Sequence, residues 1–337
     1  MSLIARLRAV ATPLAPGLML AATIAAAAAF LGAHYGAPVM LFALLLGIAF
    51  NFLHEDGQCR EGVEFASKFI LRLGVGLLGI RIAFDDLAQI GLAGVSLLVG
   101  LIALTIATGF LAAPLFARKW RFALLTGGAV AICGASAALA IAAVIPANDK
   151  TERNTLFTVM AVTALSTIAM VLYPLLFQGL GFSDLQQGFL IGATIHDVAQ
   201  VVGAGFSVSD AAGEMATITK LFRVAMLPVV LVVIVLVLRV AGPGPAEGGK
   251  IPLLPWFMVL FLALVALGSV VDLPTALVAQ VETLSRAFLI TAIAALGVKT
   301  SLKALTAVGG GHLAIVVIET LVLLGLAIAA LVWLDVL

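Results

Sequence analysis

Charged residues are scarce in this chain. Asp, Glu, Lys and Arg make up only 10% of its 337 residues, whereas 63% are hydrophobic, and the mean hydropathy is +1.25. A water-soluble domain of this length needs more charge on its surface, so the composition predicts an all-α polytopic membrane protein in a lipid bilayer. The net charge of +1 provides no basic surface, so nucleic acid is not expected as a partner.

Cysteine is rare in the chain, and a nucleotide-binding motif is missing. Cys59 and Cys133 are the only cysteines, too few for a disulfide or zinc framework, so no metal and no cofactor is expected. The chain has no G-x-x-x-x-G-K-[ST] motif. Any active transport must therefore draw on an ion gradient or on a partner protein.

Apolar segments, separated by Gly, Pro, Asn, Asp or charged residues, predict about eleven transmembrane segments in one integral membrane domain, residues 1–337. The approximate segments are Ala15–Gly32, Val39–Leu53, Phe65–Phe84, Leu87–Phe116, Phe122–Ile145, Leu156–Phe177, Gln187–Phe206, Asp210–Val240, Leu253–Val271, Leu284–Leu305 and His312–Leu334. The sequence at 241–250 is typical of a flexible polar linker.

Lysine and arginine positions predict the orientation. Arg6 and Arg8 precede the first segment, which we expect to be retained as a helix rather than removed as a signal peptide. Together with the basic cluster at 118–121 and Arg239, they place the N-terminus in the cytoplasm, and we expect a multi-pass protein of the bacterial inner (cytoplasmic) membrane.

Two loops do not fit this orientation. Residues 148–154 carry Lys150 and Arg153 yet fall outside, and the loop at 178–187 has no basic residue yet falls inside. Both conflicts disappear if the segments at 122–145 and 187–206 are broken and do not cross as ordinary helices. Such backbone is tolerated in a membrane only where it is buried in protein or lines a cavity.

An internal repeat supports a transporter architecture. Residues 67–91 align without gaps on residues 285–309, and we extend the repeat to 67–116 with 285–334. The matched basic residues are Lys68 with Arg286 and Arg81 with Lys299. The two copies lie an odd number of segments apart, so they are predicted to have opposite orientations. Inverted repeats with broken helices at mid-membrane are typical of secondary transporters.

The stretch from Gly192 to Ser207 supplies one half of a predicted site. It holds His196, Asp197 and Gln200 inside an apolar chain, and ionisable residues at bilayer depth usually mark a substrate, ion or proton path. If the segment is helical there, His196 and Gln200 share a face. The alternative is a buried polar network that only ties helices together.

The glycine-rich stretch at 126–137 supplies the other half. Gly128 and Gly134 permit an unwound section beside Cys133, and the half-helix that follows would present free N–H groups to an anion, with the Ser136 hydroxyl nearby. The alternative is close helix packing by small residues.

Four more charged residues are candidates. Lys220 and Arg223 lie three apart on one face of the eighth helix, where they would neutralise an anion or pair with Asp197; an ion pair with a structural carboxylate is the alternative. Glu319 and Arg72 are candidates for ion coupling, although Glu319 is more simply expected to pair with Arg72 or Lys299.

Three stretches together resemble the YeiH-type family of proposed sulfate exporters: A-I-C-G-A-S-A, T-I-H-D-V-A-Q-V-V-G-A-G and A-T-I-T-K-L-F-R-V. The resemblance covers nearly the whole chain. It implies a distant relation to transporters of the bile-acid-symporter and sodium/proton-antiporter fold, with two broken, crossing helices. Ala129-Val130-Ala131 stands where the family usually has Gly-Thr-Ser, and Asp197 stands where it commonly has Glu, so the substrate is left open.

Three functions follow as hypotheses. The first is a secondary transporter that exports sulfate, a sulfonate or another small oxyanion by alternating access coupled to an ion gradient. The second is a cation/proton antiporter that uses His196, Asp197 and Glu319. An intramembrane enzyme or sensor with Cys133 and His196 as nucleophile and base is disfavoured, because no third orienting group is evident; we therefore expect no enzyme. Na+ or H+ is the expected coupling ion, and the oligomeric state is left open.

Overall fold

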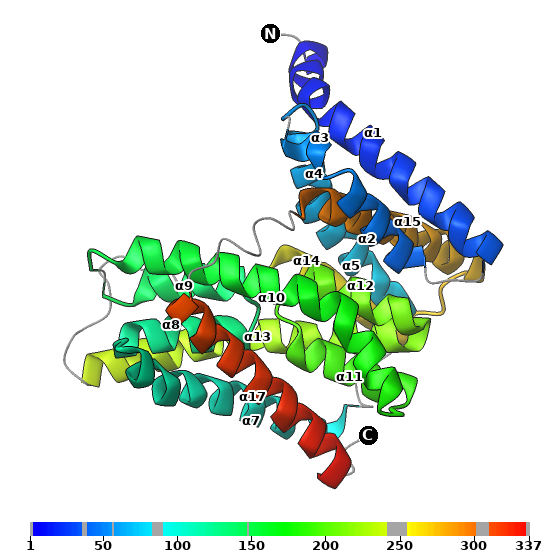
Figure 1. The fold of residues 1–337 in the computed structure, drawn as a ribbon. Coiled ribbons are helices and arrows are strands. Elements are labelled where there is room, and N and C mark those ends of the chain that lie inside the picture. Colours follow the sequence, from blue (N-terminus) through cyan, green and yellow to red (C-terminus); the bar gives the residue numbers. More distant parts are fainter. Residues whose placement is uncertain are drawn as a thin grey trace. The chain divides into compact units, whose positions relative to one another are not determined.

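The computed structural model describes residues 3–35, 39–55, 57–82, 90–146, 148–240, 255–300 and 310–334. These residues form helices joined by short turns and contain no strands, which confirms the all-α membrane class. The chain packs into two compact units (Figure 1). Unit 1 comprises residues 1–87, 202–213 and 256–302, and unit 2 comprises residues 88–201, 214–255 and 303–337.

Unit 1 contains the first part of each copy of the predicted repeat, together with the helices beside them. Its helices are α1 (Leu3–Tyr35), α2 (Val39–Ala49), α3 (Phe52–Glu55), α4 (Arg60–Phe65), η1 (Ala66–Ile70), α5 (Leu71–Leu78), η2 (Gly79–Arg81), α14 (Trp256–Val270) and α15 (Thr275–Lys299). The unit also holds the end of α12 (Val198–Val208) and the start of α13 (Asp210–Val240). A π-helical turn, η1, joins α4 to α5.

Helices α5 and α15 of unit 1 run antiparallel. Arg81, just after α5, bonds Glu282 near the start of α15 at 2.8 Å, whereas Gly74, earlier on α5, accepts a 2.7 Å bond from Ser285. Gly74 also lies against Leu289, one turn further along α15. This opposite direction agrees with an inverted repeat. The duplication itself stays a prediction, and its residues 83–89 and 301–309 lie outside the described residues.

Unit 2 contains the segments that were predicted to be broken. Its helices are α7 (Gly91–Ala112), η3 (Ala113–Phe116), α8 (Trp120–Ala131), α9 (Ala135–Val144), α10 (Thr151–Gly179), α11 (Asp184–Thr194), the first turn of α12, most of α13, and α17 (Gly310–Leu334). The predicted segment at 122–145 is therefore split at 132–134, and the segment at 187–206 is split at 195–197.

The first interruption is a hairpin. Helix α8 ends at Ala131, Gly134 takes φ +64°, and α9 folds back along α8, against which it packs (Figure 1). A side chain at Gly128, on α8, would collide with Ile141, on α9 beyond the turn. With 12 and 10 residues, α8 and α9 are about 18 and 15 Å long, close to half of a hydrocarbon core of about 30 Å.

The hairpin brings the two basic clusters of unit 2 to one end. The His312 ring at the start of α17 lies 5.1 Å from the Phe122 ring of α8 and 4.6 Å from the Phe157 ring of α10. The first turns of α8, α10 and α17 therefore meet. Lys150 lies just before α10 and Arg153 lies in its first turn, so both are at the same end as the basic residues before α8. This agrees with the prediction that the segment at 122–145 does not cross the membrane.

Six described helices are long and apolar enough to cross a membrane. They are Thr12–Tyr35, Gly91–Phe116, Thr151–Gly179, Asp210–Val240, Thr275–Lys299 and His312–Trp333. The other predicted segments are short, interrupted or partly outside the described residues, so the number of eleven stays a prediction. The predicted linker at 241–250 also lies outside the described residues.

Gly134→Ala tests the hairpin. A Cβ at φ +64° is strained and would lie 3.3 Å from the Cβ of His196, so we expect the variant to lose about 1–3 kcal/mol of stability. Thermal unfolding in detergent measures the loss. Gly100→Ala is the matched control, because Gly100 is helical with open space where a Cβ would lie and should be neutral or slightly stabilising. Equal melting temperatures for the two variants would contradict the hairpin geometry.

Candidate functional site

Arg223 joins the two interruptions of unit 2. Its side chain extends from α13 and donates all five of its N–H groups to backbone carbonyl oxygens. Nε and Nη2 donate to Ala131 at 3.0 and 2.8 Å, and Nη2 also reaches Val130 at 2.8 Å, at the end of α8. Nη1 donates to Gly192 and Ile195, both at 3.0 Å, at the end of α11. The guanidinium therefore holds the ends of two separate half-helices together.

Lys220, one turn earlier on α13, repeats this bridge. Its Nζ donates to Ile132 O at 2.7 Å and to Ile195 O at 2.9 Å, so Ile195 O accepts from both cations. Both side chains are buried, with 0% and 1% exposure for Lys220 and Arg223. Within the described chain these two bonds use two of the three ammonium hydrogens of Lys220, which leaves one for a further acceptor.

The carbonyl ends are suited to cations. The last carbonyls of a helix lack intrahelical partners and carry the negative end of its dipole, about half a charge, so the ends of α8 and α11 together offset about one of the two positive charges. The starts of α9 and α12 contribute about half a positive charge each, which the Asp197 carboxylate balances. With Lys220 and Arg223 charged, the junction keeps about one positive charge.

Asp197 and His196 lie in the second interruption. The Asp197 carboxylate caps α12, because its Oδ1 accepts from the N–H of Ala199 at 2.8 Å. The hydroxyl of Ser166 on α10 accepts from the N–H groups of His196 and Asp197 at 3.1 and 3.0 Å. These bonds satisfy the backbone groups that the interruption exposes, so the break is a stable feature of the fold.

Helix α17 contacts both interrupted segments through neighbouring residues. The Thr320 hydroxyl lies 3.1 Å from Nε2 of His196 and donates to Val316 O at 2.7 Å. The Oε1 of Glu319 accepts a 2.7 Å bond from Thr126 on α8. Glu319 is fully buried, and its Oε2 has no hydrogen-bond partner among the described residues.

The junction is accessible at one side. Cys133 and Gly134 are buried, but Ser136 at the start of α9 is exposed, and Ala135 and Asp197 are half-buried. Gly134, the N-cap of α9, provides no side-chain cap. The described residues therefore leave the start of α9 uncovered at Ser136, beside Asp197 and near Lys220.

The structure differs from two of the predictions. Among the described residues Lys220 and Arg223 pair with no carboxylate: they bond to C-terminal carbonyls, where the dipole favours cations. His196 and Gln200 do not share a helix face, because the helix stops at Thr194 and resumes at Val198. Gln200 instead donates to Thr167 on α10 at 2.8 Å.

Glu319 lies in unit 2, whereas Arg72 and Lys299, its expected ion-pair partners, lie in unit 1, so this pair stays a prediction. The Glu319 carboxylate bonds to Thr126, whereas Arg72 is exposed in unit 1, 6.0 Å from the centre of the Phe257 ring. Lys299 lies within electrostatic range of Glu64 and His54, also in unit 1. Arg72 is thus a surface cation beside an aromatic ring.

Several polar residues at the site were missed from the sequence. Thr126 contacts Glu319, and Ser166 contacts the backbone at 196–197. Thr167 contacts Gln200, and Thr320 contacts His196. Ser166-Thr167 is a pair of adjacent polar residues in the middle of α10, and Thr320 is next to Glu319, so both had a weak signal in the sequence. Gly128 serves packing against Ile141, the alternative raised for the glycines.

With this geometry established, comparison with known proteins adds the family. Residues 16–316 match the model of the family described as Conserved hypothetical protein 698. The chain belongs to this family. Its relatives include the UPF0324 membrane protein TauZ of Paracoccus denitrificans, 52% identical over 310 residues that cover 91% of this chain and 92% of TauZ.

The UPF0324 inner membrane protein YeiH of Escherichia coli K12 is 35% identical over 311 residues, 87% of this chain and 86% of YeiH. The UPF0324 membrane protein CT0845 of Chlorobaculum tepidum is 46% identical over 321 residues, 95% of this chain and 90% of CT0845. No solved structure matches. The resemblance to the YeiH family and the membrane location are confirmed, and the relation to bile-acid symporters stays a prediction.

Arg223→Lys tests the bridge. Lysine keeps the charge but has three donors instead of five and cannot form the planar fork, so several carbonyls at the ends of α8 and α11 lose their partner. We expect a loss of about 2–4 kcal/mol, measured by thermal unfolding in detergent. Arg239→Lys, an exposed position on the same helix, is the matched control and should unfold like the unsubstituted protein. An unchanged melting temperature for Arg223→Lys would contradict the bridge.

Proposed function

We propose that this protein is a secondary transporter of a small anion, such as sulfate, a sulfonate or another oxyanion. It works by alternating access coupled to an ion gradient, in the bacterial inner membrane with its N-terminus in the cytoplasm, and it does not change its substrate chemically. The observation that carries the proposal is the junction of two interrupted helices around Lys220 and Arg223, which has an excess of about one positive charge by the dipole estimate.

The start of α9 and the free hydrogen of Lys220 are the proposed contacts of the anion. N–H groups at a helix start favour an anion. The Ala137 N–H already bonds to Cys133, so the N–H groups of Ala135 and Ser136 remain, with the Ser136 hydroxyl beside them. Each group alone is a weak indication. Together with a buried ammonium that has one uncommitted donor, they form a set of donors with few competing acceptors. Alternating access then requires this junction to be exposed to each side of the membrane in turn.

Glu319 is the proposed coupling residue. Its carboxyl group is buried, contacts a hydroxyl rather than a cation, and lies next to Thr320, which contacts His196. A buried carboxylate without a cation is costly, so the group is suited to take up a proton or to bind Na+. Protonation at Glu319 would act on the first interruption through Thr126 and on the second through the adjacent Thr320.

A cation/proton antiporter is the second candidate. The half-buried Asp197 carboxylate at the accessible side of the junction favours it, since this is the group that an incoming cation would meet first. An enzyme with Cys133 and His196 as a reactive pair is not favoured, because the two side chains form no hydrogen bond with each other among the described residues and His196 Nδ1 has no partner there.

The transport assay uses proteoliposomes loaded with unlabelled sulfate and diluted into labelled sulfate. We expect counterflow, and we expect Lys220→Gln, His196→Ala and Asp197→Asn to abolish it while the protein stays folded, as judged by gel filtration and thermal unfolding. Lys119→Gln, an exposed position, is the control and should retain counterflow. Normal flux in the folded His196 and Asp197 variants would refute the site, and pH-driven sodium movement without sulfate counterflow would favour the antiporter.

Glu319→Gln separates coupling from binding. The amide keeps the shape of the side chain and an oxygen for Thr126 but cannot carry a proton, so we expect counterflow to persist while the stimulation by a pH gradient is lost. Glu152→Gln, an exposed residue in the first turn of α10, is the control. A Glu319→Gln variant that still responds fully to the gradient would remove Glu319 from the coupling step.

A further inference from the structure

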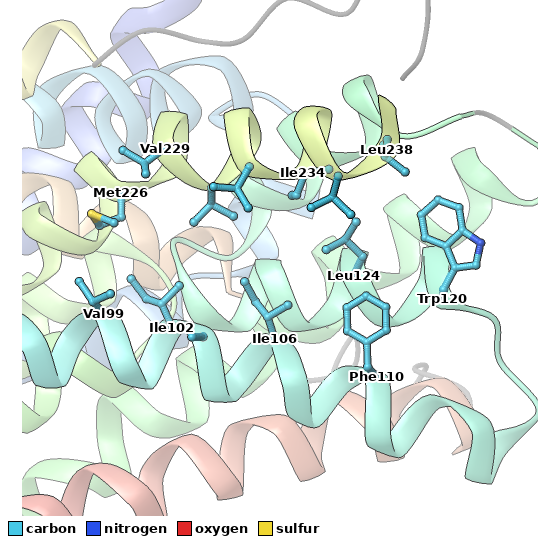
Figure 2. A pocket seen from close by; sticks show the side chains of 14 residues that line it. Val99, Ile102, Ile106, Phe110, Trp120, Leu124, Met226, Val229, Ile234 and Leu238 are labelled. Carbon is cyan, nitrogen blue, oxygen red and sulfur yellow. The ribbon is translucent and has the colours of Figure 1, made fainter. Parts of the chain in front are cut away.

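An apolar groove of about 680 Å³ lies in unit 2 between α7, α13 and the first turns of α8 (Figure 2). On α7 the groove extends from Val99 to Phe110, and on α13 it extends from Met226 to Leu238. Trp120 of α8 closes the end near Leu238 and Phe110 (Figure 2). The groove is separate from the junction of the interrupted helices, and none of the residues of that junction lines it.

The dimensions of the groove match one leaflet of a bilayer. From Met226 to Leu238 the helix α13 rises about 18 Å, and half of a hydrocarbon core is about 15 Å. The groove is also open along its side, because Val229, Val233 and Val237 are 51%, 53% and 56% exposed. An acyl chain from one leaflet fits this length and chemistry.

Positive charge gathers at the closed end of the groove. Arg118, Lys119 and Arg121 surround Trp120 in sequence, and Arg239 follows Leu238. The Arg121 guanidinium lies 5.2 Å from the Trp120 ring centre. The Arg118 guanidinium lies 5.6 Å from the centre of the Phe122 ring, which is close in sequence but does not line the groove. Among the described residues, none of these cations forms a salt bridge with a carboxylate, and the Nε atoms of Arg118 and Arg121 are buried without a hydrogen-bond partner.

We propose that this groove binds an anionic phospholipid, with one acyl chain along α7 and α13 and the phosphate at the basic residues around Trp120. Clusters of Lys and Arg beside membrane helices attract anionic headgroups, and Trp is favoured at the headgroup level. The positive-inside pattern places this lipid in the cytoplasmic leaflet. A second copy of the chain is a poorer occupant, because its own basic end would be repelled by the same charges.

Quenching of Trp120 fluorescence by brominated lipids tests the proposal. In a Trp256→Phe/Trp333→Phe protein, Trp120 is the only tryptophan. When each brominated lipid is titrated into otherwise identical bilayers, phosphatidylglycerol should reach half-maximal quenching of Trp120 at a several-fold lower mole fraction than phosphatidylcholine. In the same background, Arg118→Gln/Arg121→Gln should reduce this preference about fivefold for each charge removed.

Two controls decide the outcome. Arg60→Gln/Lys68→Gln removes two exposed cations of unit 1, which pair with Glu64, and should keep the preference. Ala103→Phe places a ring on the α7 wall of the groove and should weaken quenching by both lipids. Equal quenching by the two lipids, a preference that survives Arg118→Gln/Arg121→Gln, or no quenching by either lipid because a protein covers the groove, would each overturn the proposal.

Discussion

Unit 2 depends on the hydrogen bonds between two buried cations and the carbonyl ends of two half-helices. Water is absent from the hydrocarbon core, so the carbonyls that an interrupted helix leaves open must find donors within the protein. Arg223 and Lys220 provide these donors for α8 and α11 at once. The dependence is mutual, because neither cation would be tolerated at this depth without the carbonyl oxygens and helix dipoles that surround it.

The same arrangement underlies the proposed binding site. The C-terminal ends of α8 and α11 are occupied by cations, and the start of α12 is capped by Asp197. The start of α9 is only partly capped, by Cys133 on the Ala137 N–H, and its Ser136 is exposed. Helix α17 links this junction to a second buried group, since Glu319 contacts α8 and the adjacent Thr320 contacts His196. Binding and coupling are thus assigned to neighbouring parts of one unit.

Much of this architecture was predictable from the sequence, because the positions of glycines and charged residues in an apolar chain indicate where a membrane helix is interrupted. Glycines indicated both interruptions, ionisable residues added to the signal for the second one, and the misplaced basic residues at 148–154 indicated that the first one does not cross. The partners of Lys220 and Arg223 were not predictable, because backbone carbonyls have no signature in the sequence. The shared face of His196 and Gln200 was wrong because it assumed a continuous helix, which ends at Thr194.

A high-resolution cryo-electron microscopy structure in sulfate-containing buffer tests the central claim most directly. The account predicts that α8 and α11 end at a common junction with Arg223 and Lys220 on their carbonyls, and that anion density lies between Lys220 and the start of α9. Continuous helices through 132–134 and 195–197, or a Lys220 ammonium bonded to Asp197 with no density beside the start of α9, would contradict it.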